Sequence, residues 1–327
     1  MDTELLLLCE DELPNIDFEE LDSNDLLDIE QYVEITRFLQ EIHSIFEMFR
    51  YNSKRFWRKY ASITQAKQRK INRNNIHDDY ISINALISNL LNSGKNLNEA
   101  MECYVKEIYN ESSQERTDFL KYRNCTYDNC FSYRYLIRLR DYAQHGHLPI
   151  NFNQKGFCFD LHQLLTKPHF TVNAALKKEL ESIRLEVMSH YGDIATFSIH
   201  RTVAEFTKEL LAIYFEFIKT VKPKFQLSEM QFSEISERYS YNHTKVGSLQ
   251  LPCFLYRSSN NEIHAIVTES RLELDSYISV VNSTYLSYKK LFENIEQNSI
   301  KLWLRLDESR IEIEFGDLGE LESHPAS

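Results

Sequence analysis

Residues 127–150, YDNCFSYRYLIRLRDYAQHGHLPI, carry the pattern that decides the fold. On a helical wheel at about 100° per residue, centred on Leu139, the apolar side chains cluster within about 80° of that residue. They define an expected buried face made of Phe131, Ser132, Tyr135, Leu136, Leu139, Tyr142, Ala143 and Gly146. The periodicity therefore predicts a helix over residues 131–145 that packs one side into a core.

The rest of this predicted helix is polar. One stripe, with spacings of 4, 3 and 4, consists of Arg134, Arg138, Asp141 and His145. Arg140 and Gln144 lie on the opposite flank. Asp141 and His145 are i, i+4 neighbours, so the carboxylate is placed to orient the imidazole. Arg140 and His145 are roughly 140° apart on the wheel. They can share one phosphate only if the helix end distorts at Gly146 or if two copies of the helix face each other.

At these residues the sequence resembles the HEPN superfamily, whose members are α-helical domains with an R-[ND]-x-x-x-H motif near the end of a helix. The matching residues here are Arg140-Asp141-Tyr142-Ala143-Gln144-His145. The resemblance extends over about residues 79–221. It implies a metal-independent endoribonuclease without a cofactor that works as a homodimer, with the Arg and His pairs of two subunits in one cleft. A biological role as a toxin or phage-defence effector follows from the resemblance alone.

The resemblance also implies a role for each residue. His145 acts as general acid or base while the neighbouring 2′-hydroxyl attacks the phosphate, and Arg140 holds that phosphate and stabilises the transition state. Asp141, which stands where many family members have Asn, orients His145. The expected RNA-contacting residues on this helix are Arg134, Arg138 and Gln144. Arg55, Arg58 and Lys59 are also expected to contact RNA, but they lie in a basic stretch that the resemblance does not explain. The product is a 2′,3′-cyclic phosphate, and DNA, which lacks the 2′-hydroxyl, resists cleavage.

Two other interpretations stay open. The bare Arg-to-His spacing is common by chance, and it recurs at Arg37/His43, Arg184/His190 and Arg238/His243. In a purely structural interpretation, Arg140 is a solvated flank residue and His145 satisfies carbonyls of the last helical turn. In the alternative functional interpretation, the chain is a non-catalytic HEPN-like subunit that binds RNA, or a protein partner such as an antitoxin, through the same surface.

Residues 50–73 form a basic stretch with nine Lys or Arg residues and no acid. Four aromatic residues lie among these charges: Tyr51, Phe56, Trp57 and Tyr60. Such a stretch can follow phosphates and stack bases. It can equally be an amphipathic helix whose aromatic side chains face the core while its cations are solvated. A third hypothesis is that an acidic end of the chain masks the stretch.

Composition indicates a mainly α protein, because 7 Gly and 6 Pro in 327 residues supply few turns or bulges. No glycine-rich nucleotide-binding motif occurs. The net charge of -12 lies in residues 1–30, which hold twelve acids and no Lys or Arg, so the remaining chain is neutral. Six scattered cysteines without a signal peptide indicate a reduced, cytoplasmic protein, and no apolar run is long enough for a membrane span. Cys125 and Cys130 lack the C-x2-C spacing of a zinc site, so no metal is predicted.

The chain divides into an acidic arm over 1–27, a helical HEPN-like domain over 28–222 and a small α+β region over 223–327, with the boundary near Pro223. Helices are expected over 29–49, 79–91, 97–109, 131–145, 172–191, 198–221 and 272–295. The basic stretch either continues the first of these helices or forms the next one. Residues 156–165 are expected to be extended. Two hairpins are predicted, one pairing 249–256 with 263–268 and one within 301–315.

Overall fold

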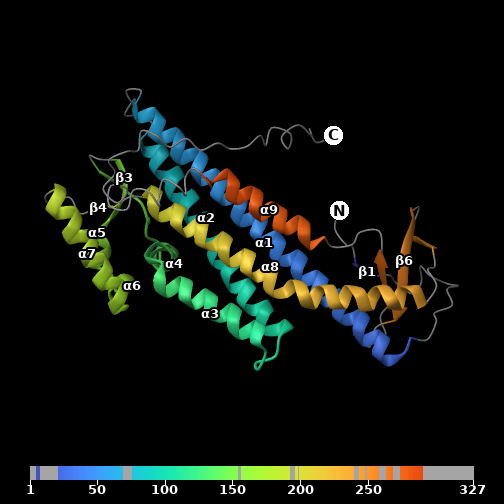
Figure 1. Cartoon of the computed structure of the whole chain (residues 1–327). Helices are drawn as coiled ribbons and strands as arrows, with labels where there is room; N and C mark the ends of the chain where they lie inside the picture. Colours follow the sequence, from blue (N-terminus) through green and yellow to red (C-terminus); the bar gives the residue numbers. More distant parts are fainter. Residues whose placement is uncertain are drawn as a thin grey trace.

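The computed structural model describes residues 5–7, 21–68, 76–153, 156–191, 196–197, 199–238, 243–246, 249–257, 263–267 and 273–289. In these residues the protein is mainly α-helical with short antiparallel strands, as the composition predicted. Three long helices run side by side through the molecule (Figure 1). They are α1 (Ser23–Gln68), α2 (Ile76–Ile108) and α8 (Ile199–Arg238).

The three long helices share an aromatic core. Helix α1 runs antiparallel to α8, because Tyr32 near its start stacks on Phe232 at 4.5 Å, whereas Trp57 near its end meets His200 at 5.5 Å. Phe46 stacks on Tyr214 at 4.1 Å between these two points. All three α1 rings are buried. The apolar stripe of α1 thus continues without a break into the basic stretch, which extends the same helix.

Helix α2 is continuous where the sequence predicted two helices. Gly94 lies in the gap between the two predicted helices, and glycine weakens a helix interior. In the structure Gly94 is a contact point with α8: a Cβ atom there would lie 2.8 Å from Leu210 Cδ1 and 2.9 Å from Phe206 Cζ. The missing side chain lets the two helices approach closely, and their packing holds α2 together through this residue.

The helix end predicted at residue 221, before Pro223, is wrong, because Pro223 lies inside α8. A proline inside a helix removes one backbone hydrogen bond and disfavours the helix. Here Pro223 itself is exposed, whereas Val221 and Phe225 on either side are buried in the core. Burial of these neighbours holds the helix through the proline to Arg238.

Helices α3 (Gln114–Asn129) and α4 (Phe131–Gln144) form a pair that packs on α8. Helix α4 confirms the predicted element, and most of its expected buried face is buried. Tyr133 and Arg134 are buried in addition, while Gly146 is exposed. Helix α3 was not predicted, because it is polar throughout and buries only Phe119. The Ser113 side chain caps its first turn by accepting a hydrogen bond from the Arg116 amide.

Beyond α4 the chain forms a small layer beside the bundle. Its strands, in the order β2-β3-β4, are β2 (Asn151–Asn153), β3 (Gly156–Asp160) and β4 (Thr196–Phe197), and its helices are α5 (Leu161–Leu165), α6 (Pro168–Thr171) and α7 (Ala174–Tyr191). The extended prediction for 156–165 is correct for β3 but wrong for α5. Asp160 ends the strand and starts the helix, because its carboxylate accepts a hydrogen bond from the Gln163 amide.

A second antiparallel sheet has the order β1-β7-β6-β5, with β1 (Leu5–Leu7), β5 (His243–Val246), β6 (Leu249–Arg257) and β7 (Ile263–Val267). The β6–β7 pair confirms the first predicted hairpin. Leu5–Leu7, from the acidic arm, pairs with β7. Helix α9 (Leu274–Ser287) confirms part of the predicted helix and docks on α1, where Tyr277 stacks on His43 at 3.7 Å. The hairpin predicted within 301–315 lies outside the described residues.

Candidate functional site

The C-terminal end of α4 is shaped by glycine. Helix α4 ends at Gln144, and His145 is its C-cap residue with non-helical backbone angles. Gly146 follows with φ of +82°, the left-handed conformation that glycine adopts without strain, and its amide donates to the Ala143 carbonyl at 3.2 Å. The chain therefore turns away directly after His145, and the His145 side chain is exposed.

On one flank of this end, side chains of α2 and α4 form a connected group that we call the α2–α4 polar cluster: Asn92, Lys95, Arg140, Asp141 and Gln144. Arg140 Nε donates to Asn92 Oδ1 at 3.0 Å, and Gln144 Nε2 donates to the same oxygen at 3.3 Å. Asp141 Oδ1 accepts from Lys95 Nζ at 3.1 Å and from Arg140 Nη1 at 3.3 Å. Contacts from α2 thus fix the direction of the Arg140 and Asp141 side chains.

The cluster controls the charge of Asp141. Burial alone would raise the pKa of this carboxyl group, but hydrogen bonds and positive charge from Lys95 and Arg140 outweigh burial and hold the pKa below its usual value. Asp141 is therefore an ionised partner of two cations. Among the described residues its carboxylate bonds to these cations and not to His145, so the predicted orientation of His145 by Asp141 is not found. His145 is the C-cap residue and its backbone angles are not helical, so its side chain does not take the i, i+4 position relative to Asp141 that a continuous helix would give.

His145 lies on the other flank, toward α6. Its ring centroid is 5.0 Å from that of His169, with an interplanar angle of 43°. His169 also contacts the edge of the buried Tyr142 ring at 5.9 Å, while His147 stacks on Tyr142 at 4.3 Å. Arg140 faces α2 and His145 faces α6, so the two motif residues point to different neighbours in one copy of the chain. This arrangement agrees with the angular separation that the helical wheel gave.

Arg134 is placed inside the protein. Its side chain is 6% exposed, and its Nη1 donates to the Tyr127 and Asp128 carbonyls at 2.6 Å each. Its Nη2 bonds to the carboxylate of Glu179 on α7. The guanidinium thus caps the end of α3 and ties it to α7. The prediction that Arg134 contacts RNA is wrong for this arrangement, because both terminal nitrogens are committed to internal acceptors.

The other expected RNA-contacting residues differ in exposure. Arg138 is half-buried, and its Nε has no hydrogen-bond partner among the described residues. Arg55 and Arg58 on α1 are exposed. Lys59 forms a 2.7 Å ion pair with Asp79 of α2. None of these side chains is part of the α2–α4 polar cluster.

The basic stretch is an amphipathic helix as far as residue 63. Phe56, Trp57 and Tyr60 are buried in the bundle core. Only Tyr51 of the four aromatic residues is exposed, and Arg55 lies over its ring at 5.5 Å. Three of the four rings are therefore unavailable to stack on bases, and the amphipathic interpretation holds for residues 50–63. Residues 69–73, with the remaining cations, lie outside the described residues.

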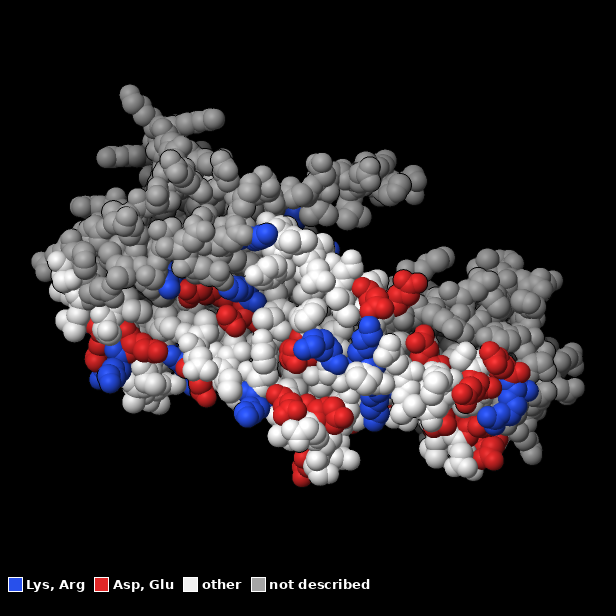
Figure 2. All heavy atoms as spheres, in the orientation of Figure 1, with Lys and Arg blue, Asp and Glu red and all other residues white. Residues whose placement is uncertain are grey.

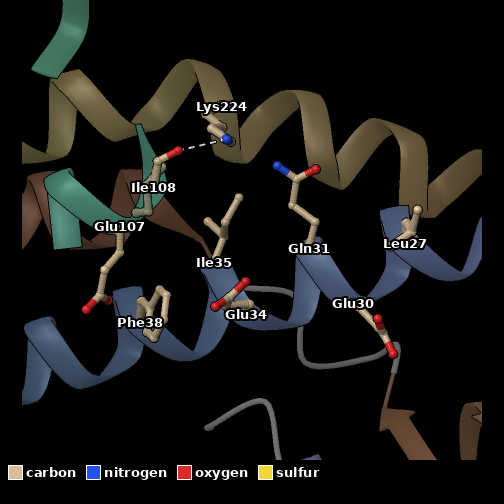
Figure 3. A pocket seen from close by; sticks show the side chains of 9 residues that line it. All are labelled: Leu27, Glu30, Gln31, Glu34, Ile35, Phe38, Glu107, Ile108 and Lys224. Atoms are coloured by element: carbon tan, nitrogen blue, oxygen red, sulfur yellow. Dashed lines mark hydrogen bonds between the residues drawn. The ribbon is translucent and has the colours of Figure 1, made fainter. Parts of the chain in front are cut away.

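Charges of opposite sign are interspersed on the face of the molecule in Figure 2, over the described residues. A separate pocket of about 390 Å³ lies between α1, the end of α2 and α8. It is lined by the carboxylates of Glu30, Glu34 and Glu107, and Lys224 donates to the Ile108 carbonyl at 2.9 Å (Figure 3). Three carboxylates against one amine already bonded to protein disfavour an RNA phosphate there. The α4 end is the better candidate for phosphate chemistry.

Three residues at the α4 end were missed by the sequence analysis: Asn92, Lys95 and His169. Asn92 and Lys95 are i, i+3 neighbours and therefore lie on one side of α2. That spacing is the only local signal, and it does not say which helix they face. No feature of the sequence indicated a role for His169, because its contact with His145 depends on how α6 packs against α4.

No family model, curated protein or solved structure matches this chain. In the described part of the chain, no helix is long and apolar enough to cross a membrane. No group of three or more His, Cys, Asp or Glu side chains in that part is arranged to hold a metal ion.

Proposed function

We propose that this protein is an endoribonuclease of HEPN type that cleaves RNA without a metal ion, with its active site at the C-terminal end of α4. One observation carries the proposal: an exposed imidazole at the helix end, His145, follows an arginine, Arg140, whose guanidinium is held by Asn92 and Asp141. His145 serves as general acid or base. Arg140 binds the phosphate and stabilises charge that develops in the transition state.

Arg140 has capacity left for a ligand. Its side chain is 18% exposed, and its bonds to Asn92 and Asp141 are made by Nε and Nη1. An arginine held at one edge keeps its other edge oriented, so less conformational entropy is lost when a phosphate binds. Because Arg140 and His145 face different neighbours in one copy, we propose that a homodimer brings the Arg140 of one subunit to the His145 of the other. A role in cell defence remains a proposal based on the sequence resemblance.

The second candidate is a non-catalytic RNA-binding or protein-binding subunit. The ion pair between Arg140 and Asp141 favours it, because the carboxylate occupies one guanidinium nitrogen and repels a phosphate. Both candidates use the same surface. They differ in whether a covalent bond of the RNA is broken.

The test is incubation of the purified full chain with labelled single-stranded RNA and tRNA in EDTA, followed by analysis of the product ends. The nuclease proposal predicts 2′,3′-cyclic phosphate ends and their loss in His145→Ala and Arg140→Ala. Arg37→Ala is a matched control, because Arg37 is exposed and is followed by His43 at a spacing similar to that between Arg140 and His145. Binding without cleavage supports the second candidate. If the protein neither binds nor cleaves RNA, both the nuclease proposal and the RNA-binding form of the second candidate are overturned.

A further inference from the structure

His169 has no role in the motif, yet it is the residue whose ring lies beside that of His145. It comes from α6, a short helix that packs against α4. Its side chain is half-buried, and the buried rings of Tyr142 and Phe170 lie close to the pair. His145 is exposed. The two imidazoles thus form a partly sheltered pair at the surface, open on the His145 side.

Cleavage by 2′-hydroxyl attack requires two proton transfers. A base takes the proton of the 2′-hydroxyl as the 2′ oxygen bonds to phosphorus, and an acid protonates the 5′ oxygen as its bond to phosphorus breaks. Imidazole is the side chain that exists in both the neutral and the protonated form near neutral pH. A single histidine in one protomer supplies only one of the two groups at the start of the reaction.

We propose that His169 is a second catalytic residue and that His145 and His169 are the base and acid of one RNA-cleaving site, a proposal that rests on the proposed nuclease function. One ring accepts the 2′-hydroxyl proton while the other donates its proton to the departing 5′ oxygen, which keeps the electron pair of the broken bond. The products are a 2′,3′-cyclic phosphate and a 5′-hydroxyl end. One proton has entered one ring and one has left the other, so the step balances without a metal or a redox partner.

This assignment places both proton-transfer groups within one subunit. The homodimer then serves to bring Arg140 to the phosphate and is not needed to complete the acid–base pair. The α2–α4 polar cluster and the histidine pair would therefore have separate tasks, phosphate binding on one flank of α4 and proton transfer on the other.

The test compares His169→Phe with His145→Ala in the full chain. Phenylalanine keeps an aromatic ring against Tyr142, so the melting temperature should stay close to that of the wild type. Removal of either imidazole should slow cleavage by about 10²-fold or more. His162→Ala is the control, because His162 is an exposed histidine on the neighbouring helix α5. This variant should cleave RNA at the wild-type rate.

A substrate with sulfur in place of the bridging 5′ oxygen separates catalysis from packing. A thiolate leaves without protonation, so the variant that lacks the acid should recover most of its rate on this substrate, while the variant that lacks the base should not. Rescue of one of the two variants is the expected result. A His169→Phe variant that cleaves ordinary RNA at the wild-type rate, or rescue of neither variant, would overturn the role of His169. An inert wild type would overturn the nuclease proposal itself, and the pair would then have no reaction to serve.

Discussion

Arg140 is oriented by a residue from another helix, because its Nε donates a 3.0 Å hydrogen bond to Asn92 Oδ1. The same oxygen accepts from Gln144 Nε2 at 3.3 Å. One amide on α2 thereby sets the position of two side chains on the last turns of α4. If Arg140 binds a phosphate, the efficiency of that binding depends on Asn92, which the motif does not contain.

Asn92→Ala should therefore reduce RNA cleavage about tenfold, equivalent to about 1.4 kcal/mol for one hydrogen bond to a charged group. The loss should appear in kcat/KM, with the melting temperature little changed. Asn96→Ala is the matched control, since Asn96 is an exposed asparagine on the same helix. Equal rates for the two variants would contradict a positioning role for Asn92.

Lys95→Met should raise the pKa of Asp141, because Lys95 is a main source of the positive charge that lowers it. The titration of the Asp141 carboxyl carbon by NMR measures this shift directly, and Lys95→Arg should largely retain the wild-type value. A carboxyl group whose pKa is lowered by folding stabilises the native state above its unfolded pKa, and this contribution is lost as the pH falls through the folded pKa. Lys95→Met should therefore cost up to about 1 kcal/mol at pH 7.

Arg134→Ala should lower the free energy of unfolding by about 3 kcal/mol, because it leaves the Tyr127 and Asp128 carbonyls and the Glu179 carboxylate without their shared donor. Urea denaturation at pH 7 measures the change. Glu179→Gln should cost less, since the arginine still caps both carbonyls. A loss no larger in Arg134→Ala than in Glu179→Gln would show that the capping bonds contribute little.

His200 should make the protein sensitive to acid. Burial beside Trp57 lowers the pKa of His200 to about 4, from an ordinary value of 6.5. Because the unfolded chain binds this proton more readily, stability is full above pH 6.5 and falls as the pH drops toward 4, by up to about 3 kcal/mol. In His200→Phe the slope of unfolding free energy against pH should be smaller over this range. An unchanged slope would mean that other groups cause the acid sensitivity.

Gly146→Ala should cost about 1 kcal/mol, because a residue with a Cβ is strained at a φ of +82°. Gly146→Asn should cost less, since asparagine tolerates the left-handed conformation. Thermal unfolding of the two variants gives the comparison. No atom lies within 4 Å of a Cβ at this position, so steric contact does not contribute and the difference reports backbone conformation alone.

The local sequence pattern was sufficient to predict the helices whose apolar residues repeat with a clear helical period. Helix α4 was predicted to within one residue of its end, since its apolar residues repeat at the helical spacing. Helix α3 was missed, because it has one buried residue and its C-terminal carbonyls are capped from Arg134 of another helix. Helices α2 and α8 both continue past the ends that the sequence predicts, at residues 91 and 221, because packing against neighbouring helices outweighs the weakness that Gly94 and Pro223 bring.

Composition and helical periodicity are sufficient to predict that the protein is mainly α, that one face of α4 is buried and that Arg140 and His145 lie on different flanks. These properties follow from 3.6 residues per turn and need no knowledge of the neighbours. The tertiary structure decided which residues those flanks meet, namely Asn92 and Lys95 on one side and His169 on the other. Contacts between distant elements depend on how all helix faces pack together, and a local period contains no information about that arrangement.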